Sequence, residues 1–333
     1  MGFPMEADRW PGKLWTVSHK PVAVAAGLGQ MGTHRNVIHP KFGNFILLGT
    51  VLLADEIARG DQSQPLDYNP CLKCMLCVAA CPVGAIGPDG SFNFSSCYHH
   101  NYREFMGGFN DWVEQLAESR SRADYRKKVS AAETVSMWQS LGFGPNYKSA
   151  YCMAVCPAGE DVVAAYRLNK AEHTREILRP LQEKKETLYV IRGSDAEAHA
   201  RKRFPHKFHK LVRSNLVPSR IEGFLSGLSL TFQPAASKGL AARYHFIFTD
   251  VAGTEPGAKV EATVEIRDQK IEIQTSLRDK PDLCLEADAK TWLRYLRGES
   301  SIVLALLLRK VRLRGPLRLL QAFGRCFPSG RKT

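Results

Sequence analysis

Strict alternation of hydrophobic and polar residues marks the second half of the chain. In the segment KVEATVEIRD the apolar positions are Val260, Ala262, Val264 and Ile266, and the following KIEIQTSL repeats the alternation. A period of two predicts half-buried β-strands, and the RDQK that joins them predicts a short hairpin. We therefore expect two neighbouring antiparallel strands here.

Helical periodicity surrounds these strands. It predicts helices over 221–230, in ADAKTWLRYLRGE and in SIVLALLLRK, because apolar residues recur there at three- and four-residue intervals. The apolar positions expected to face a core are Phe224, Leu225, Leu228, Phe246, Phe248, Trp292, Leu293, Leu296, Leu304, Leu307 and Leu308. Together these elements indicate an α+β domain with an antiparallel sheet.

The first half of the chain has a different pattern. The apolar, β-branched run 45–53 predicts a buried strand, and GDQSQPLDYNP predicts a polar connection after it. Helical patterns follow over 110–141 and 161–178, with GFGPNYKS between them. The stretch 191–213, which contains HARKRFPHKFHKLVRS, is predicted to be a basic linker between two domains.

Composition places the protein among globular chains. Of its 333 residues 44% are hydrophobic and 24% charged, which is ordinary for a folded protein of about two domains. The first residues lack the apolar core of a signal peptide, and the late apolar run 302–308 is much shorter than the roughly 20 residues that cross a bilayer. We therefore expect a cytoplasmic protein, with peripheral attachment to a membrane surface as the alternative.

The net charge of +13 is concentrated in two segments. Residues 201–220 contain seven Lys or Arg and no acidic residue, and residues 309–332 contain eight and none. The later segment, LLLRKVRLRGPLRLLQAFGRCF, is amphipathic, so it predicts contact with an anionic lipid surface or a redox partner; a solvated face is the alternative. Nucleic acid also attracts such charge, but no nucleic-acid-binding motif accompanies it.

Cysteine spacing carries the strongest chemical signal. Seven of the nine cysteines lie between Cys71 and Cys156; their odd total and tight spacing argue against a disulfide framework. The segment CLKCMLCVAACP has the C-x-x-C-x-x-C-x-x-x-C-P spacing of a cubane iron–sulfur site. Zinc sites generally come as two separated pairs, so iron–sulfur binding is the prediction.

The remaining cysteines predict a second cluster. In two-cluster ferredoxins the last cysteine of each group ligates the other cluster. That exchange assigns Cys71, Cys74, Cys77 and Cys156 to cluster 1, and assigns Cys81, Cys97 and Cys152 to cluster 2.

A regular second motif would carry another cysteine at position 149, where the chain has Ser149. Three alternatives remain open for the fourth position of cluster 2. The cluster has only three irons, or Ser149, His99 or His100 ligates the fourth iron, or the position is open to solvent or substrate.

A glycine-rich segment, GLGQMG, also fits the dinucleotide-binding pattern through Gly27, Gly29 and Gly32. That pattern requires a long helix after the glycines, whereas Pro40 follows eight residues later. We expect instead a tight loop close to the clusters or to a corrinoid.

In its first half the chain resembles the ferredoxin portion of the epoxyqueuosine reductases and reductive dehalogenases. The resemblance rests on AVAAGLGQMGTHRNVIHPKFGNFILLGTVLL, CLKCMLCVAACPVGAI, SSCYHH and YCMAVCP, and it covers 21–159. It implies two cubane clusters that pass electrons to a cobalamin, with Cys97 as the isolated ligand of the second. Because most of that family's cobalamin-binding domain has no counterpart here, residues 1–60 are expected to be its remnant.

The second half resembles the sterol-carrier-protein type 2 domain over 214–328. The paired alternating strands, PDLCLEADAKTWLRYLRGE and the helix and basic strand after it carry this resemblance. It implies an apolar tunnel for an acyl chain, a sterol or a similar ligand.

These observations predict a domain order and a function. We expect a remnant of a cobalamin-reductase-like domain (1–60), a two-cluster ferredoxin-like domain (61–190), the basic linker (191–213) and a sterol-carrier-like domain (214–333). The predicted function is electron transfer, with a redox protein and a hydrophobic lipid or sterol-like molecule as partners. The alternatives are a cobalamin-dependent reductase, or a fragment of one, and an iron–sulfur sensor coupled to lipid binding.

Overall fold

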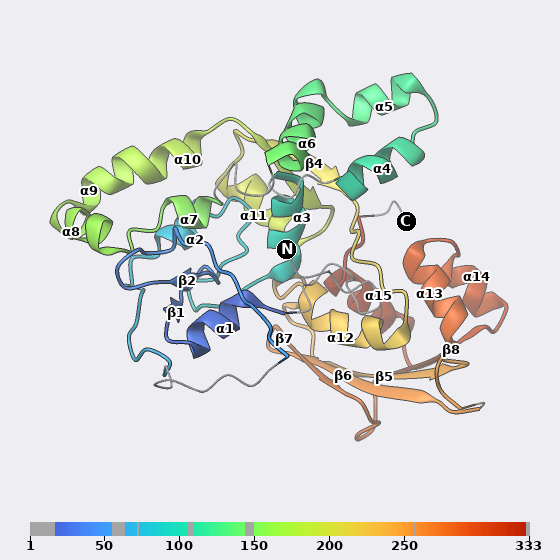
Figure 1. Cartoon of the computed structure of the whole chain (residues 1–333). Helices are drawn as coiled ribbons and strands as arrows, with labels where there is room; N and C mark the ends of the chain where they lie inside the picture. Colours follow the sequence, from blue (N-terminus) through green and yellow to red (C-terminus); the bar gives the residue numbers. More distant parts are fainter. Residues whose placement is uncertain are drawn as a thin grey trace.

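The computed structural model describes residues 17–54, 64–71, 73–104, 109–143, 150–255 and 257–330 of the chain. Figure 1 shows the cysteine-bearing first half, mainly loops and helices, beside a C-terminal part built on one sheet. The α+β prediction is therefore confirmed.

The C-terminal sheet has five strands in the order β7-β6-β5-β8-β9. The strands are β5 (Ala242–Thr249), β6 (Val260–Arg267), β7 (Lys270–Gln274), β8 (Leu283–Asp288) and β9 (Val311–Arg314). The predicted hairpin is β6–β7, in which Asp268 and Gln269 take left-handed φ angles of 52° and 60°, as a tight hairpin turn requires. All pairs are antiparallel except β5–β8, which is parallel.

Four α-helices complete this part of the chain. They are α12 (Ile221–Thr231), α13 (Ala289–Arg297), α14 (Ile302–Leu307) and α15 (Leu317–Cys326). Figure 1 shows α12 and α15 over one face of the sheet. Phe224, Phe246 and Trp292 form the centre of the core, with ring centroids between 5.5 and 6.1 Å apart. Packing of this kind stabilises the domain by burying large apolar areas.

One part of the core prediction is wrong. Leu304, Leu307 and Leu308 are 53%, 75% and 57% exposed. Helix α14 has only six residues, and it turns Ala305 inward, where that side chain is 4% exposed. A short helix presents only one narrow stripe to the core, so its other leucines face outward.

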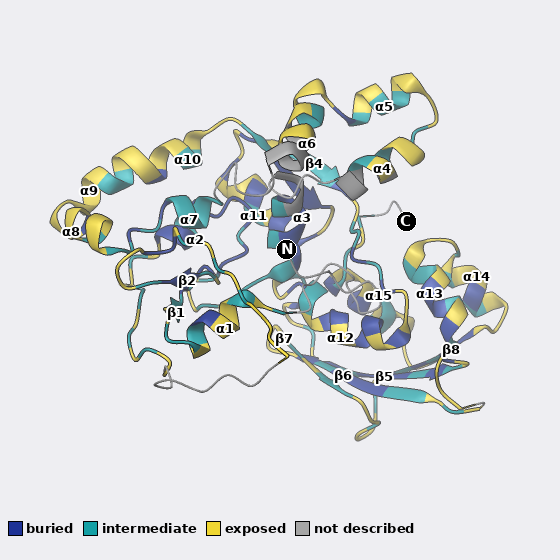
Figure 2. Cartoon of the chain, viewed as in Figure 1, coloured by how far each residue is buried: buried dark blue, intermediate teal, exposed yellow. Residues whose placement is uncertain are grey.

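The first half consists mainly of short helices. They are α1 (His19–Ala25), α2 (Leu76–Ala80), α3 (Phe94–Glu104), α4 (Phe109–Ala117), α5 (Arg122–Lys128), α6 (Ala131–Phe143), α7 (Tyr151–Ala154), α8 (Glu160–Leu168), α9 (Lys170–His173), a π-helical turn (Thr174–Leu178) and α10 (Arg179–Glu183). The helical patterns over 110–141 and 161–178 are thus each divided into shorter pieces. Figure 2 shows α8 to α10 largely exposed and α3 largely buried.

The buried strand predicted over 45–53 does not form. This segment pairs with none of the described strands, and Leu47 and Val51 are 87% and 81% exposed. A side-chain hydrogen bond of 2.9 Å between His19 Nδ1 and Thr50 Oγ1 holds this segment beside α1. Apolar composition alone predicts burial, but a strand also needs a neighbouring edge with which to pair.

The stretch 191–213 is folded, contrary to the predicted linker. Strand β3 (Thr187–Ile191), helix α11 (Asp195–Arg203) and strand β4 (Phe208–Val212) form a parallel β–α–β unit. Ala196, Ala200 and Phe204 are buried in the same core as Cys77 and Cys81. In α11 the basic residues 201–203 are exposed, whereas the small residues Ala196 and Ala200 are buried. Because alanine is only weakly apolar, the sequence hides the amphipathic pattern of this helix.

The β–α–β unit also joins the two halves. The Asp195 carboxylate accepts hydrogen bonds from the backbone N–H groups of Ala235 and Ala236 at 2.8 and 3.2 Å. The Asp195 N–H in turn donates to Oε1 of the fully buried Gln233 at 3.0 Å. Because these bonds connect the cysteine-bearing half to the C-terminal part, the two halves are held in a defined relation.

Candidate iron–sulfur site

The first cysteine group surrounds a cavity beside α2. Cys71, Cys74, Cys77 and Cys156 all line this cavity, whose volume is about 200 Å³. Lys73 and Met75, which stand between the cysteines, take left-handed φ angles of 53° and 54°. Non-glycine residues rarely adopt this conformation unless the surroundings impose it, so the loop is bent tightly where the thiols converge.

The second cysteine group comes from three separate elements. Cys81 follows α2, Cys97 lies on α3 and Cys152 lies on α7. Burial raises the pKa of Cys97, and the nearby Cys81 and Cys152 thiolates raise it further. The structure thus brings together the three cysteines that the spacing assigns to cluster 2.

The electrostatic effects on the cysteine pKa values divide the seven cysteines into the same two groups. Burial raises the pKa of Cys156 to about 11, and among the neighbouring cysteines it is Cys74 and Cys71 that add to the shift. Burial likewise raises the pKa of Cys77 and of Cys152 to about 12. Cys77 is influenced by Cys152 as well as by its own group, so the two groups adjoin.

The raised pKa values of these cysteines indicate that thiolates at these positions need a bound cation. Several buried thiolates repel one another, and a bound cation relieves that repulsion because metal ligation displaces the thiol protons. The donor set is made only of sulfur, which suits iron–sulfur clusters. Among the described residues no group of three or more His, Cys, Asp or Glu side chains could hold a single metal ion. A cubane does not need such convergence, since each of its irons takes a different thiolate.

Hydrogen bonds reach the cysteine sulfurs in both groups. The Thr33 backbone N–H and hydroxyl each donate to Cys71 Sγ at 3.2 Å. The Ala85 N–H donates to Cys81 Sγ at 3.2 Å, and the Asn101 side-chain amide donates to Cys97 Sγ at 2.9 Å. Donors of this kind stabilise the more negative, reduced state of a cluster and therefore raise its reduction potential.

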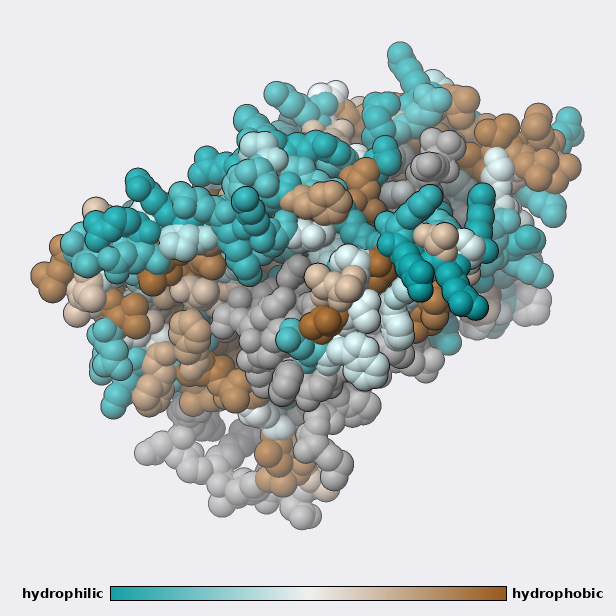
Figure 3. All heavy atoms as spheres, turned by 90° about the horizontal axis from the view of Figure 1, so that it is seen from above, coloured by the Kyte–Doolittle hydropathy of each residue, from teal (hydrophilic) through white to brown (hydrophobic). Residues whose placement is uncertain are grey.

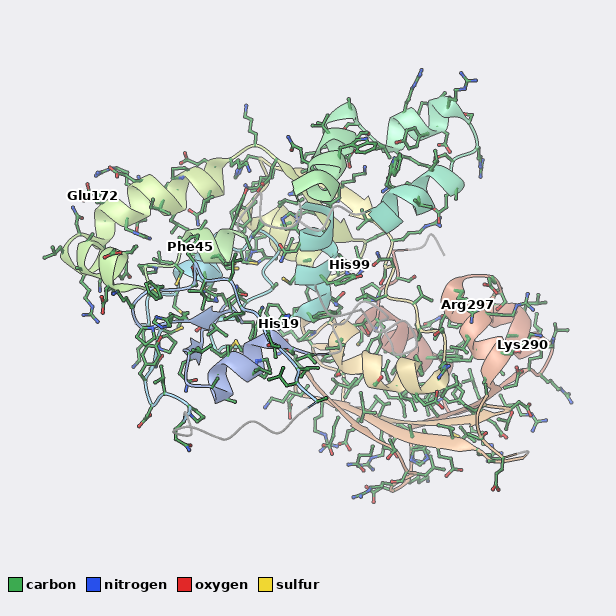
Figure 4. The ribbon with its side chains drawn as sticks, in the orientation of Figure 1. His19, Phe45, His99, Glu172, Lys290 and Arg297 are labelled. Carbon is green, nitrogen blue, oxygen red and sulfur yellow. The ribbon has the colours of Figure 1, made fainter. Side chains whose placement is uncertain are left out.

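The two candidate histidines of cluster 2 are engaged elsewhere. His99 is 1% exposed and interacts through Nδ1 with the Ser95 carbonyl at 2.6 Å and through Nε2 with Ser214 Oγ at 3.2 Å. His100 Nδ1 accepts a hydrogen bond of 3.5 Å from the Tyr189 N–H. Figure 4 labels His99 on α3. Both histidines thus have hydrogen-bond partners outside the second cysteine group, and Ser149 lies outside the described residues.

The glycine-rich loop serves backbone packing. Gly27 has a φ angle of 68°, and a Cβ on Gly29 would lie 2.4 Å from the Ile38 carbonyl oxygen. A Cβ on Gly32 would lie 2.6 Å from Ile38 Cδ1. These glycines allow β1 (Gln30–Met31) to pair closely with β2 (Val37–Ile38). The described residues between Gly32 and position 54 contain no helix. The long helix that a dinucleotide-binding pattern requires after its glycines is therefore not found there.

Sequence analysis missed Lys20 of α1. Its charge opposes the rise in the pKa of Cys97 and of Cys152, and its Nζ donates to the Arg35 carbonyl at 2.8 Å. A positive charge beside this cysteine group would favour the reduced state of a cluster held there. No sequence signal marks this residue, because it lies outside every cysteine motif.

An apolar cavity of about 140 Å³ lies where the two halves meet. Helices α12, α13 and α15 provide most of its lining, through residues that include Phe224, Trp292 and Phe323. Ser95 of α3 and Ser214 also line it. One cavity thus touches both the C-terminal core and the helix that carries Cys97.

Family models match two separate parts of the chain. Residues 65–87 match the 4Fe-4S binding domain, and residues 230–328 match the SCP-2 sterol transfer family. The chain therefore carries an iron–sulfur domain and a sterol-carrier domain, and both resemblances drawn from the sequence are confirmed.

Curated relatives are named epoxyqueuosine reductase. The protein of Staphylococcus aureus (strain NCTC 8325 / PS 47) is 36% identical over 81 residues, which are 24% of this chain and 20% of that protein. The protein of Escherichia coli (strain K12) is 28% identical over 104 residues, or 31% and 26% of the two chains. That of Aliivibrio fischeri is 24% identical over 196 residues, or 50% and 51%. The chain spans about half or less of the length of these relatives.

Solved sterol carrier structures also match the C-terminal part. Sterol Carrier Protein 2 from Yarrowia lipolytica is 9% identical, with 28% of this chain and 75% of that chain covered and a TM-score of 0.24. The sterol carrier protein domain 2 of Helicoverpa armigera is 14% identical, with 33% and 86% covered and a TM-score of 0.28.

Taken with the site, the comparisons support an iron–sulfur redox role, and the sterol-carrier domain indicates a hydrophobic ligand. In the part of the chain that the structure describes, we found no helix with the length and apolar character needed to span a bilayer.

Proposed function

We propose that the chain is a two-cluster electron-transfer protein whose sterol-carrier domain holds a hydrophobic substrate or acceptor. The observation that carries this proposal is the division of seven cysteines into two adjoining groups, beside an apolar cavity that touches the same helix as Cys97. Cys71, Cys74, Cys77 and Cys156 would hold cluster 1, and Cys81, Cys97 and Cys152 would hold cluster 2. Bound clusters supply one-electron transfer.

The residues around the cysteines would set the properties of each centre. Thr33, Ala85 and Asn101 donate hydrogen bonds to cysteine sulfurs, and Lys20 places a positive charge near cluster 2. Cys81 is buried and Cys97 half-buried, which would limit the access of water to the second centre. In the proposed domain order, residues 1–60 are a remnant of a cobalamin-reductase-like domain and residues 61–190 form the two-cluster domain, which ends within β3. The sterol-carrier domain begins near Ser214.

A cobalamin-dependent reductase is the second candidate, because the curated relatives are epoxyqueuosine reductases. The protein would then work with a corrinoid in addition to its clusters. Anaerobic titration with cobalamin separates the two functions: a shift in the corrinoid spectrum supports this candidate, and an unchanged spectrum supports electron transfer alone.

The proposed function is tested by anaerobic purification, iron and sulfide analysis, and electron paramagnetic resonance before and after reduction. We expect two clusters, and we expect the reduced protein to pass electrons to a quinone-class acceptor that carries an apolar chain. A protein with a single cluster, or a reduced protein that no such acceptor reoxidises, contradicts the proposal.

Replacing Ser149 with cysteine is expected to complete the second cluster. Because His99 and His100 have hydrogen-bond partners outside the second cysteine group, we propose that cluster 2 has three thiolate ligands and takes the three-iron form. Iron should rise from about seven to about eight per chain in S149C, and the signal of an oxidised three-iron cluster should disappear. Iron analysis and paramagnetic resonance measure both changes.

Ser149→Ala is the matched control. It should keep about seven irons if Ser149 is not a ligand. Eight irons in the unaltered protein, falling in Ser149→Ala, would show instead that the serine oxygen completes the cluster.

We also propose that α14 contacts an anionic membrane surface. Val303 and Leu307 are 61% and 75% exposed, and Arg309 and Lys310 follow them directly. Figure 3 shows hydrophobic residues gathered at the right-hand end of the molecule, where Figure 1 places α13 and α14. Exposed apolar side chains beside basic ones suit the boundary between lipid headgroups and acyl chains.

Leu307→Glu is expected to weaken binding to vesicles of phosphatidylcholine and phosphatidylglycerol by about tenfold, because inserting one leucine contributes roughly 1.5–3 kcal/mol. Co-sedimentation measures the bound fraction. Leu168→Glu is the control, since Leu168 is 89% exposed at the end of α8 and should not affect binding. Equal binding of Leu307→Glu and the unaltered protein would exclude α14 as the contact.

A further inference from the structure

The apolar cavity between the two halves is bounded by both of them. Helix α12 contacts α3. Ser95 of α3 lines the cavity on the side of the iron–sulfur half, and Ser214 lines it at the start of the sterol-carrier domain. His99 interacts with Ser95 and with Ser214, so it holds these two lining residues together. A ligand in this cavity therefore touches residues of both halves.

Helix α3 presents different faces to the cavity and to the cysteines. Ser95 and His99 are four residues apart and share one face. Cys97 and Asn101 are also four apart and share another, where the Asn101 amide donates to Cys97 Sγ. Residues two positions apart on a helix differ by about 200° around its axis. The cavity and the second cysteine group thus lie on opposite sides of one helix, about 10 Å in diameter.

A buried donor in the cavity lining lacks a partner. Trp292 is 2% exposed and lines the cavity, and its indole N–H has no hydrogen-bond partner among the described residues. A buried N–H without an acceptor is energetically unfavourable, and such a group in a native protein calls for an explanation. An acceptor oxygen on a bound molecule would satisfy this donor.

The cavity size limits what can enter. A closed apolar cavity of about 150 Å³ holds a benzene ring, and this cavity has about 140 Å³. Its lining is mostly aromatic and aliphatic, which favours a planar apolar ring. Gly324 of α15 lines the cavity and is itself exposed, so a longer chain attached to the ring can leave along this side.

We propose that the cavity is a composite binding site for an apolar molecule with a single six-membered ring and a ring-attached carbonyl. Trp292 donates a hydrogen bond to the carbonyl oxygen, and α3 separates the bound ring from the second cysteine group. The role of this molecule as the hydrophobic partner of cluster 2 rests on the proposed function. Its binding in the cavity does not.

The test compares heptyl phenyl ketone with octylbenzene, which has the same chain length but no oxygen. Isothermal titration of the oxidised, cluster-loaded protein measures both affinities without electron transfer. We expect the ketone to bind about tenfold more tightly, the ratio that one hydrogen bond of about 1.4 kcal/mol provides. In Trp292→Phe that preference should vanish while octylbenzene binds as before. A preference that survives in Trp292→Phe overturns the assigned donor.

Gly324→Leu tests the cavity itself. A Cβ on Gly324 meets no atom within 4 Å, so leucine should fold normally and weaken both ligands at least tenfold. Ser229→Leu, on the exposed side of α12, is the matched control and should bind like the unaltered protein. Unchanged binding in Gly324→Leu places the ligand elsewhere and overturns the site.

Ser95→Val tests the contribution of α3, with iron content as the check on folding. We expect severalfold weaker binding of both ligands. Ser95→Thr, which keeps the hydroxyl and adds one methyl group, is the second variant if Ser95→Val loses iron. Normal binding in an iron-loaded variant of either kind shows that the site belongs to the sterol-carrier domain alone. Loss of electron transfer with normal ligand binding would count against the proposed function and leave this site intact.

Discussion

Replacing Cys77 with alanine is expected to remove about four irons and the spectrum of one whole cluster. Cys77 lines the cavity shared with Cys71, Cys74 and Cys156, and a cubane that loses one of four thiolates is poorly held. Cys156→Ala should remove the same cluster, although Cys156 lies far along the chain. Cys152→Ala, only four residues away from Cys156, should remove the other. Iron analysis and paramagnetic resonance of the three variants measure which cluster is lost.

Cys284→Ala is the matched control for these variants. Cys284 is a half-buried free cysteine on β8, outside both groups, so its replacement should leave iron and spectra unchanged. The exchanged assignment is contradicted if Cys152→Ala and Cys156→Ala remove the same cluster. In that case each cysteine motif would hold its own cluster. Cys156 would then line the same cavity as Cys71, Cys74 and Cys77 without binding the same cluster.

Replacing Lys207 with methionine is expected to destabilise the iron–sulfur half by about 3–5 kcal/mol. The Lys207 side chain is 0% exposed, and its Nζ lies 2.8 Å from Glu186 Oε1. It also donates to the Leu181 and Lys184 carbonyls at 3.1 and 2.8 Å. Methionine keeps the length of the side chain but leaves the Glu186 carboxylate, 9% exposed, with the more distant Lys184 at 3.7 Å, whose side chain is 52% exposed.

The destabilisation should reach the clusters. Glu186 also accepts the Tyr151 hydroxyl hydrogen bond, and Tyr151 begins the helix that carries Cys152. Loss of cluster absorbance during urea titration should therefore occur at a lower urea concentration in Lys207→Met. Circular dichroism in the same titration reports the loss of secondary structure.

Two further variants give this prediction its controls. Lys202→Met changes an exposed lysine of α11 and should alter stability by less than about 0.5 kcal/mol. The double variant Lys207→Met with Glu186→Leu removes both charges and should recover much of the loss, because replacing a whole buried ion pair with apolar groups is often nearly neutral. An unaltered urea midpoint in Lys207→Met would mean that the ion pair has no structural role.

Features that depend on residues close together in the sequence could be predicted, whereas features that depend on distant residues could not. The β6–β7 hairpin was predictable because alternation and turn are local. The 45–53 segment was not, because an exposed extended run and a buried strand have the same composition, and only the presence of a neighbouring edge distinguishes them. Residues 191–213 suggested a linker because basic side chains outnumber the small residues that α11 buries.

Cysteine spacing by itself determined the chemistry of this protein. Thiolates at fixed intervals predict an iron–sulfur domain, which the family comparison confirms, and alternating strands with their helices predict the sterol-carrier domain. Only the tertiary structure decided which side chains surround these features. His99 faces Ser214 instead of the cysteines, Lys20 approaches Cys97 from a distant helix, and Ser95 and Trp292 line one cavity. Such contacts join residues remote in sequence, and they depend on how the helices pack, which no local pattern encodes.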